Sequence, residues 1–439
     1  MAIELSNLTF TEQDDIVPVS GADQITNTGI ANTLAGRDII TGTAIGGSAT
    51  IGRYNIVYGI YNSHKLNTND GDDIIMGIFS DPEGNSKDFE TYFCLSNDQG
   101  IIDTGDGNDK IIGIDNTALS TNRVTSSSTG FSSYLGTVNT GNGHDIIMGT
   151  GQSYGIVNWE ATINTGNGND TITGTGNNVV GIFNLRDALN TTTFNTGDGN
   201  DRIIGNGFYA GIDNYGLMDT GEGDDIINGT NSIIGTGDFI SGGIINSVDV
   251  HTIITGNGND TIIGTGSTGI YNMGVINTGN GDDVIIGTGS TGIYNGNVIN
   301  TGNGDDSIIA NGGVNGTGEG YGIYNNGGAI NMGDGNDSII ASEGFQSGSN
   351  SSGAWFLGEG DDYIKGFGSG DFYGGNGFDT LELTPGTYTV GIWGEGSDTS
   401  AIFTKGNQLM ITSEFEKLKA GSTIYDFTSL IAGQIIVVA

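Results

Sequence analysis

A short loop motif rich in glycine and aspartate recurs along this 439-residue chain, and it constrains the fold more than any other feature. One copy is INTGNGDDVII at residues 276–286, and the next is INTGNGDDSII at residues 299–309. A turn repeated at such intervals is typical of a solenoid, in which each repeat forms one coil. Alignment on the Asp that closes each loop gives twelve copies, which end at Asp73, Asp109, Asp145, Asp170, Asp201, Asp225, Asp260, Asp283, Asp306, Asp337, Asp362 and Asp379.

The residues around this Asp predict a tight turn followed by a strand. Gly stands two residues before the Asp in all twelve copies, and four residues before it in eleven, with Asn69 as the exception. Gly and Asn reach positive φ at little cost, so the backbone can turn sharply. Two residues after the Asp comes Ile in eleven copies and Leu381 in the last, between neighbours of varied polarity. This alternation indicates a short half-buried strand.

Two further patterns complete each repeat. Seven residues before the Asp the side chain is always apolar, as in Leu66, Phe194 and Trp355, which predicts a second strand entering the turn. Between the loops lies a motif of Gly, Ile, any residue and Asn. Its Asn would either stack into a hydrogen-bonded ladder or serve only as a turn residue. The copies span 59–62, 155–158, 181–184, 211–214, 243–246, 269–272, 292–295 and 322–325, with a displaced copy at 113–116.

These patterns give each repeat about three short strands and three turns. The shortest spacing between loop aspartates is 23 residues, from Asp260 to Asp283 and from Asp283 to Asp306, and longer repeats would carry the excess as surface loops. We therefore expect an all-β fold, a right-handed parallel β-solenoid with a three-sided coil. Residues 1–60, with a degenerate loop copy at 34–42, would form an N-terminal cap. Residues 61–383 would form the repeats, and residues 384–439 a C-terminal β cap.

The charge of the chain points to cations as partners. The formal charge is −39, from 51 acidic and 12 basic residues, which argues against nucleic acid and anionic membranes as partners. If coils stack at about 4.8 Å, neighbouring loop carboxylates repel by roughly 1 to 3 kcal/mol per pair. The stacked form should then need bound cations. Carboxylate and carbonyl oxygens without a His or Cys cluster favour Ca²⁺.

The last loop copy carries a family resemblance. GGNGFDTLEL at residues 374–383 resembles the nonapeptide GGxGxDxLx of the RTX, or haemolysin-type, calcium-binding repeats. The resemblance implies that the twelve loop aspartates ligate Ca²⁺ between stacked turns. It also implies type I secretion through an uncleaved C-terminal signal, here within 384–439. The family's loops usually follow in tandem on two edges, whereas this chain has one loop per long coil. We therefore expect one calcium column along a single edge.

The expected function is that of a secreted, calcium-stabilised structural or interaction protein at a cell surface or in extracellular matrix. MAIELSNLTFTEQDD lacks the basic region and apolar core of a secretory signal, which fits export by another route. No run of 18 apolar residues suggests a membrane span. Expected partners are Ca²⁺, further copies of the chain joined through open strand edges, or a cell-surface polysaccharide.

Two alternatives stay open. The first is a polysaccharide lyase or epimerase, because parallel β-helices often host such enzymes. That chemistry needs basic residues near acids, and no Lys or Arg lies between Ile203 and Ile364, so we expect no enzyme. The second is an ice- or glycan-binding face, suggested by Thr265 and Thr288, which recur in register.

Overall fold

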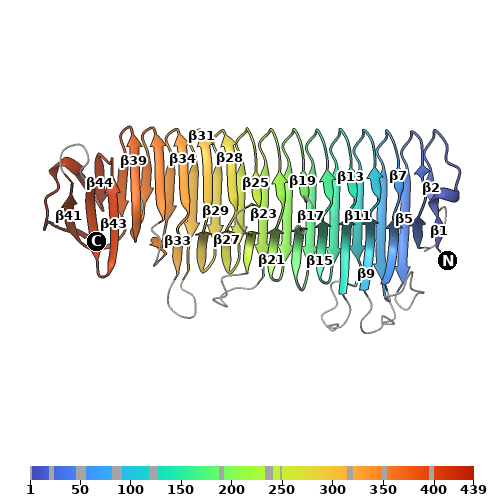
Figure 1. The fold of residues 1–439 in the computed structure, drawn as a ribbon, viewed down its shortest axis with the longest axis horizontal. Coiled ribbons are helices and arrows are strands. Elements are labelled where there is room, and N and C mark those ends of the chain that lie inside the picture. Colours follow the sequence, from blue (N-terminus) through green and yellow to red (C-terminus); the bar gives the residue numbers. More distant parts are fainter. Residues whose placement is uncertain are drawn as a thin grey trace. The chain divides into compact units, whose positions relative to one another are not determined.

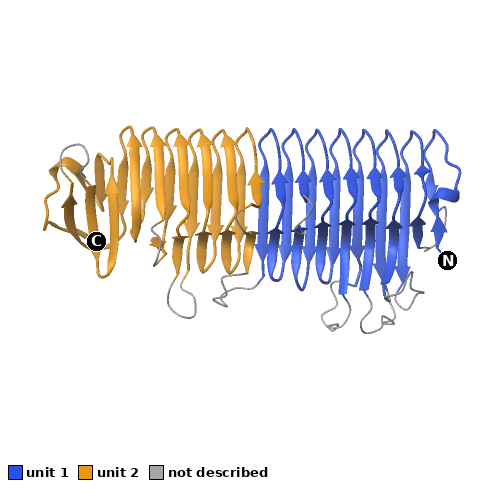
Figure 2. Ribbon diagram, in the orientation of Figure 1, with its two compact units in different colours: residues 1–232 blue, residues 233–439 orange. Residues whose placement is uncertain are grey.

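The computed structural model divides the chain into two compact units, residues 1–232 and residues 233–439 (Figure 2). Each unit is all-β and contains parts of three sheets, here called A, B and C (Figure 1). In the part of the chain that the structure describes, no helix is long and apolar enough to span a membrane. The described residues are 2–18, 24–45, 56–81, 91–117, 127–186, 192–232, 241–247, 250–313, 320–348, 353–394 and 400–439.

Unit 1 carries the first strands of the three sheets, listed here in pairing order. Sheet A contains β1 (Ile3–Glu4), β3 (Ile25–Asn27), β6 (Ile56–Asn62), β9 (Thr91–Asp98), β12 (Ser127–Tyr134), β15 (Tyr154–Trp159), β18 (Val180–Leu185) and β21 (Ala210–Asn214). Sheet B contains β2 (Ile16–Val17), β5 (Ile39–Ile45), β8 (Ile74–Ser80), β11 (Lys110–Asp115), β14 (Ile146–Gly151), β17 (Thr171–Gly176), β20 (Arg202–Gly207) and β23 (Ile226–Asn231). Sheet C contains β4 (Ala31–Asn32), β7 (Lys65–Asn67), β10 (Ile101–Asp103), β13 (Thr137–Asn139), β16 (Thr162–Asn164), β19 (Thr193–Asn195) and β22 (Leu217–Asp219).

Unit 2 repeats the arrangement. Sheet A contains β24 (Gly242–Asn246), β27 (Thr268–Asn272), β30 (Thr291–Asn295), β33 (Tyr321–Asn325) and β36 (Phe345–Ser347). Sheet B contains β26 (Thr261–Thr265), β29 (Val284–Thr288), β32 (Ser307–Asn311), β35 (Ser338–Ala341), β38 (Tyr363–Lys365), β40 (Thr380–Leu383), β44 (Lys417–Ala420) and β45 (Thr423–Asp426). Sheet C contains β25 (Thr252–Ile254), β28 (Val275–Asn280), β31 (Val298–Asn303), β34 (Ala329–Asp334), β37 (Ala354–Glu359), β39 (Gly370–Asn376), β43 (Gln408–Ser413), β42 (Ser400–Lys405), β41 (Gly386–Trp393) and β46 (Ile435–Val438).

Each repeat is one three-sided coil, because the chain adds one strand to sheet A, then to sheet C, then to sheet B. Strands of successive coils pair in parallel and in register, so equivalent apolar residues stack: Ile60 on Leu95, Leu66 on Ile102, and Ile75 on Ile111. All six of these side chains are fully buried. The inward residues of the three strands form the core of each coil, and the predicted parallel β-solenoid is confirmed.

The Gly-Ile-x-Asn motif forms an asparagine ladder on sheet A. Asn62 Nδ2 donates to Asn97 Oδ1 at 2.7 Å in unit 1, and Asn272 Nδ2 donates to Asn295 Oδ1 at 2.8 Å in unit 2. One sequence assignment was wrong, since the displaced copy at 113–116 does not belong to this ladder. Gly113 lies in sheet B, paired with Gly77 and Gly149. Ser133 takes the ladder position instead, since it pairs with Asn97 and Asn158, and residues 130–133 read Gly-Phe-Ser-Ser in place of the motif.

The coil pattern extends into the first 60 residues and changes near the C-terminus. Strands β3, β4 and β5 pair in parallel with β6, β7 and β8, so the N-terminal region continues the stack. Beyond residue 383 the pairing becomes antiparallel between β41 and β42, β42 and β43, β41 and β46, and β44 and β45. Antiparallel pairing ends the regular coil.

Candidate functional site

The twelve loop aspartates stack along one edge of each unit, where every turn links a sheet C strand to a sheet B strand (Figure 1). Within each unit, the backbone N–H of one loop Asp donates to Oδ1 of the loop Asp in the following coil. These distances are 2.7 to 2.8 Å from Asp73 to Asp225 in unit 1. In unit 2 they are 2.7 to 2.9 Å from Asp260 to Asp379. The sequence thus located the members of this column, although not their hydrogen bonds.

The column has three further members besides the twelve loop aspartates. Asp15 N–H donates to Asp38 Oδ1 at 2.8 Å, and Asp38 N–H donates to Asp73 Oδ1 at 2.7 Å. At the other end, Asp379 N–H donates to Glu416 Oε2 at 2.7 Å. Asp38 lies in the degenerate copy recognised in the sequence, whereas nothing in the loop pattern marks Asp15 or Glu416.

The stacking explains why the turn needs both glycine and aspartate. The Asp carbonyl accepts an N–H from the next coil, as in Lys110 N–H to Asp73 O at 2.8 Å. The Asp N–H is satisfied by a carboxylate instead of a carbonyl, so each side chain supplies the acceptor that the backbone lacks. The glycines are needed for close approach as well as for turning. Gly143 has φ of +154°, and a Cβ on it would lie 1.6 Å from Gly107 O.

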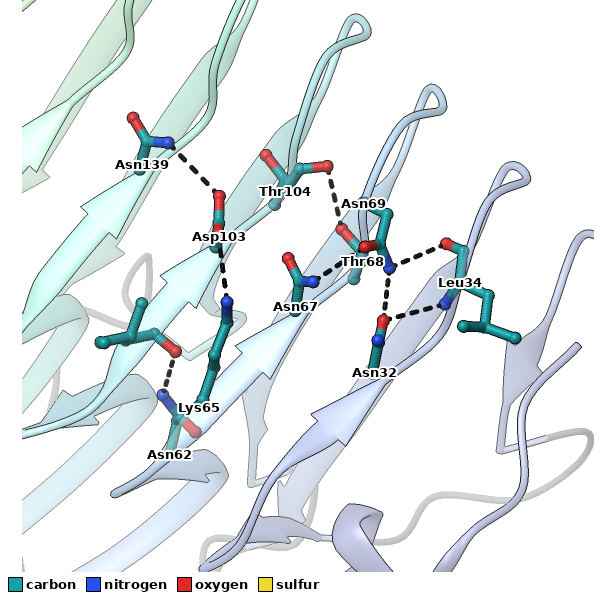
Figure 3. Close-up of polar contacts among 11 residues, drawn as sticks. Asn32, Leu34, Asn62, Lys65, Asn67, Thr68, Asn69, Asp103, Thr104 and Asn139 are labelled. Atoms are coloured by element: carbon teal, nitrogen blue, oxygen red, sulfur yellow. Dashed lines mark hydrogen bonds and ion pairs between the residues drawn. The ribbon is translucent and has the colours of Figure 1, made fainter. Parts of the chain in front are cut away.

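A threonine column runs beside the aspartates. Thr stands five residues before the loop Asp in nine of twelve copies, a signal that was present in the sequence and not used. Thr68 Oγ1 donates to Thr104 O at 3.4 Å (Figure 3). The outward side chains of the same edge also bond from coil to coil, as when Asn139 Nδ2 donates to Asp103 Oδ1 at 3.3 Å.

The column carboxyls are buried, and burial makes their ionisation unfavourable. All twelve loop aspartates are at most 1% exposed, and in ten of them, all but Asp225 and Asp260, Oδ2 is buried without a hydrogen-bond partner. Burial raises the pKa of Asp283 to about 6, of Asp337 to about 7 and of Asp109 to about 8. Hydrogen bonds lower these pKa values, from the Thr278 and Thr104 side chains to Asp283 and Asp109 and from the N–H of the adjacent Asp in all three. Neighbouring carboxylates raise the pKa values further. Burial, more than the repulsion considered from sequence, is therefore the main obstacle to ionisation.

The unpartnered oxygens are of the type that a hard cation prefers, but they are too few to fill its coordination shell. The unpartnered Oδ2 atoms are oxygen ligands of the type that Ca²⁺ prefers, but Ca²⁺ takes about six to eight oxygens. Across the described ranges, no three His, Cys, Asp or Glu side chains come close enough together to hold a metal ion. Two stacked carboxylates would need backbone carbonyls and water to complete a calcium shell.

Comparison with known proteins identifies no family for this chain. No protein-family model matches the chain, and no curated protein matches it. Sequence and structure together therefore establish a parallel β-solenoid repeat protein with stacked asparagine and aspartate ladders.

Proposed function

We propose that this protein is a secreted structural and interaction protein of a cell surface or extracellular matrix, whose fold depends on neutralising its Asp column with Ca²⁺. The observation that carries the proposal is a row of buried Oδ2 atoms without hydrogen-bond partners, from Asp38 to Asp201 in unit 1 and from Asp283 to Asp379 in unit 2. A buried carboxylate that lacks a partner destabilises the folded state. The loop aspartates, Asp73 to Asp379, are the proposed ligands.

Protons are a second candidate for the same role. The pKa of Asp109 is raised to about 8 and that of Asp201 to about 7, so part of the column would be protonated near neutral pH. A protonated carboxyl keeps Oδ1 as the acceptor of the N–H from the preceding coil and carries no charge. Calcium and protons would then compete for one column.

Far-UV circular dichroism in EDTA at pH 5 and pH 8.5, followed by titration with Ca²⁺ or Mg²⁺, separates the two candidates. Calcium dependence predicts loss of β-structure in EDTA at pH 8.5 and recovery with Ca²⁺ but not with Mg²⁺. Neutralisation by protons alone predicts the same loss without recovery on adding Ca²⁺. Full β-structure in EDTA at pH 8.5, with no change in melting temperature on adding Ca²⁺, would contradict both.

A matched variant locates the effect in the column. Asp283→Asn keeps an oxygen that can accept the N–H of Asp260 and removes the ionisable group. Under the proposal, it raises the β-structure that remains in EDTA at pH 8.5, because one buried charge is removed. Asp282→Asn, which changes the exposed neighbour in the same turn, is the control and should leave the β-structure in EDTA unchanged.

Self-association is part of the proposed structural role, but the N-terminal strand edges do not favour it. The first strands of the sheets, β1, β2 and β4, are each two residues long and offer little edge for pairing. Sedimentation velocity at saturating Ca²⁺ tests this part, and a single monomeric species would remove it. The enzyme alternative is tested separately by a panel of uronic-acid polymers, on which we expect no turnover.

A further inference from the structure

The outward face of sheet A in unit 1 is hollowed into a groove. It has a volume of about 430 Å³, within the range of small-molecule sites. The groove crosses β6, β9, β12, β15 and β18, five neighbouring strands that span about 19 Å at about 4.8 Å per strand. Its shape follows from side-chain size, because Ser96, Thr129 and Ser132 lie between larger residues. The groove thus comes from stacking coils with different outward residues.

Aromatic rings bound the groove on both sides. Tyr58 stacks on Phe93 with ring centroids 5.6 Å apart, and Tyr154 stacks on Phe183 at 5.7 Å. Trp159 meets Tyr134 edge to face at 5.5 Å, and Trp159 is 41% exposed. Rings held by their neighbours and open to water on one face offer rigid apolar surface to a ligand at small entropic cost.

Polar groups complete the groove. Tyr61 Oη donates to Asp98 Oδ2 at 3.1 Å, which fixes a carboxylate at the rim. Gln99, Ser127 and Thr91 add further donors and acceptors. The described residues that line the groove include no Lys, Arg or His, in a chain of formal charge −39. An anionic ligand would therefore meet no compensating charge.

We propose that this groove binds a chain of neutral pyranose sugars. A pyranose has an apolar C–H face, which fits the aromatic rings, and a rim of hydroxyls, which can donate to Asp98. The absence of basic lining residues argues against uronic-acid and sulfated polymers. A peptide adding as a strand has no place here, because β6 and β18 each pair with a strand on both sides. The length of the groove suits several sugar units.

This inference deepens the interaction role proposed above and rests on it for its biological setting, although the groove itself does not involve the Asp column. Binding is therefore measured at pH 5.5 with Ca²⁺, where either protons or calcium can neutralise the column. Far-UV circular dichroism at this pH reports folding separately from sugar binding. A folded protein that binds no sugar overturns the groove assignment alone.

The probes are cellohexaose, xylohexaose, maltohexaose and chitohexaose, with an oligogalacturonate for comparison. Titration calorimetry gives affinities. In a Trp393→Phe background, a change in fluorescence on adding sugar reports on Trp159, since Trp355 is fully buried and cannot contact the ligand. We expect at least one neutral hexasaccharide to bind and to shift the Trp159 emission. Trp159→Ala should weaken binding tenfold or more, and Ser132→Phe, which fills the hollow, should abolish it. Asp98→Asn should weaken it less.

The matched control is Tyr324→Ala on sheet A of unit 2, which should leave sugar binding unchanged. The assignment is overturned if none of the four sugars binds, if oligogalacturonate binds equally well, or if the groove variants bind as the parent does. One further outcome would identify a different occupant of the groove. If no sugar binds, the parent self-associates and Ser132→Phe is monomeric, the groove is occupied by a second copy of the chain.

Discussion

Sheet A presents two different outward faces in the two units. In unit 2, Tyr271, Tyr294 and Tyr324 occupy the same position in successive coils, with ring centroids 4.7 and 5.2 Å apart. In unit 1 the matching position holds Ser96 and Ser132 in neighbouring coils. Nearly identical coils place one ring on the next and close the surface, whereas diverged coils place small residues beside large ones. Repeated outward residues therefore form columns, and outward residues that differ from coil to coil leave a pocket.

The Asp column is common to both units, so the comparison separates scaffold from surface. Variants in the column should affect the two units alike, except where pKa values differ. Variants on the outward face of sheet A should affect them differently. The four predictions below follow this division, from the largest expected effect to the smallest.

Stability should fall steeply with rising pH in EDTA. The folded-state pKa of the column carboxyls lies above the ordinary value of 3.8, so below about pH 4 both states are protonated and nothing is lost. As pH rises toward the folded-state pKa, stability is lost, by roughly 1 to 2 kcal/mol per coil after allowance for solvent screening. Summed over a column, this rivals the roughly 5 to 15 kcal/mol of domain stability.

Individual coils should differ in the pH at which this loss ends. The pKa of Asp283 and Asp306 is about 6, and that of Asp109 is about 8. The rate of amide hydrogen exchange, corrected for its intrinsic pH dependence, should stop rising above about pH 6 in peptides covering 276–286. In peptides covering 102–112 the rate should continue to rise to about pH 8. Equal profiles in the two peptides would contradict the difference.

Adding a methyl group to a turn glycine should be severe in both units. The Cβ of Gly107→Ala would lie 1.8 Å from Gly71 O, and that of Gly281→Ala would lie 1.9 Å from Gly258 O. We expect about 3 kcal/mol or more of lost stability in each, because both φ strain and a backbone clash result. Gly406→Ala is the control, since it has positive φ and nothing within 4 Å. Thermal melts should show a loss of only about 1 kcal/mol there.

Tyrosine truncation should distinguish the two faces of sheet A. Tyr294 is 9% exposed and lies between two rings, so Tyr294→Ala should reduce stability by about 2 to 4 kcal/mol. Tyr154 is only half-buried and stacks on one ring, so Tyr154→Ala should reduce it by about 1 kcal/mol. Chemical denaturation measures both, and equal losses would show that the groove rings are packed as tightly as the tyrosine stack.

Completing the asparagine ladder in unit 1 should give a small gain. Asn97 Nδ2 donates to Ser133 Oγ at 3.3 Å, where other coils have Asn. Ser133→Asn should extend the ladder toward Asn158 and add about 0.5 to 1 kcal/mol. Asn97→Ser, the reverse change one coil earlier, should lose a similar amount, and a loss in both variants would mean that the site has no room for the longer side chain.

Much of the fold followed from spacing alone. Ile75 and its equivalents were assigned inward because flanking positions vary in polarity, and all of them are buried. The coil around Asp109 shows the limit of this method. There the Gly113–Asn116 match misplaced the ladder by a whole strand, because the strand that holds the ladder position carries Ser133 in place of Asn and so does not match the motif. Ser133 could be assigned only from its partners Asn97 and Asn158.

The sequence by itself determined the coil, the turn and the position of each of the twelve loop aspartates, because those depend on local periodicity and on the backbone freedom of glycine. The tertiary structure alone decided what the aspartates contact and where the surface is hollow. Asp73 bonds to Asp109, and Ser96 lies beside Ser132, although each pair is separated by 36 residues. Such neighbours are set by stacking register, which no local pattern encodes.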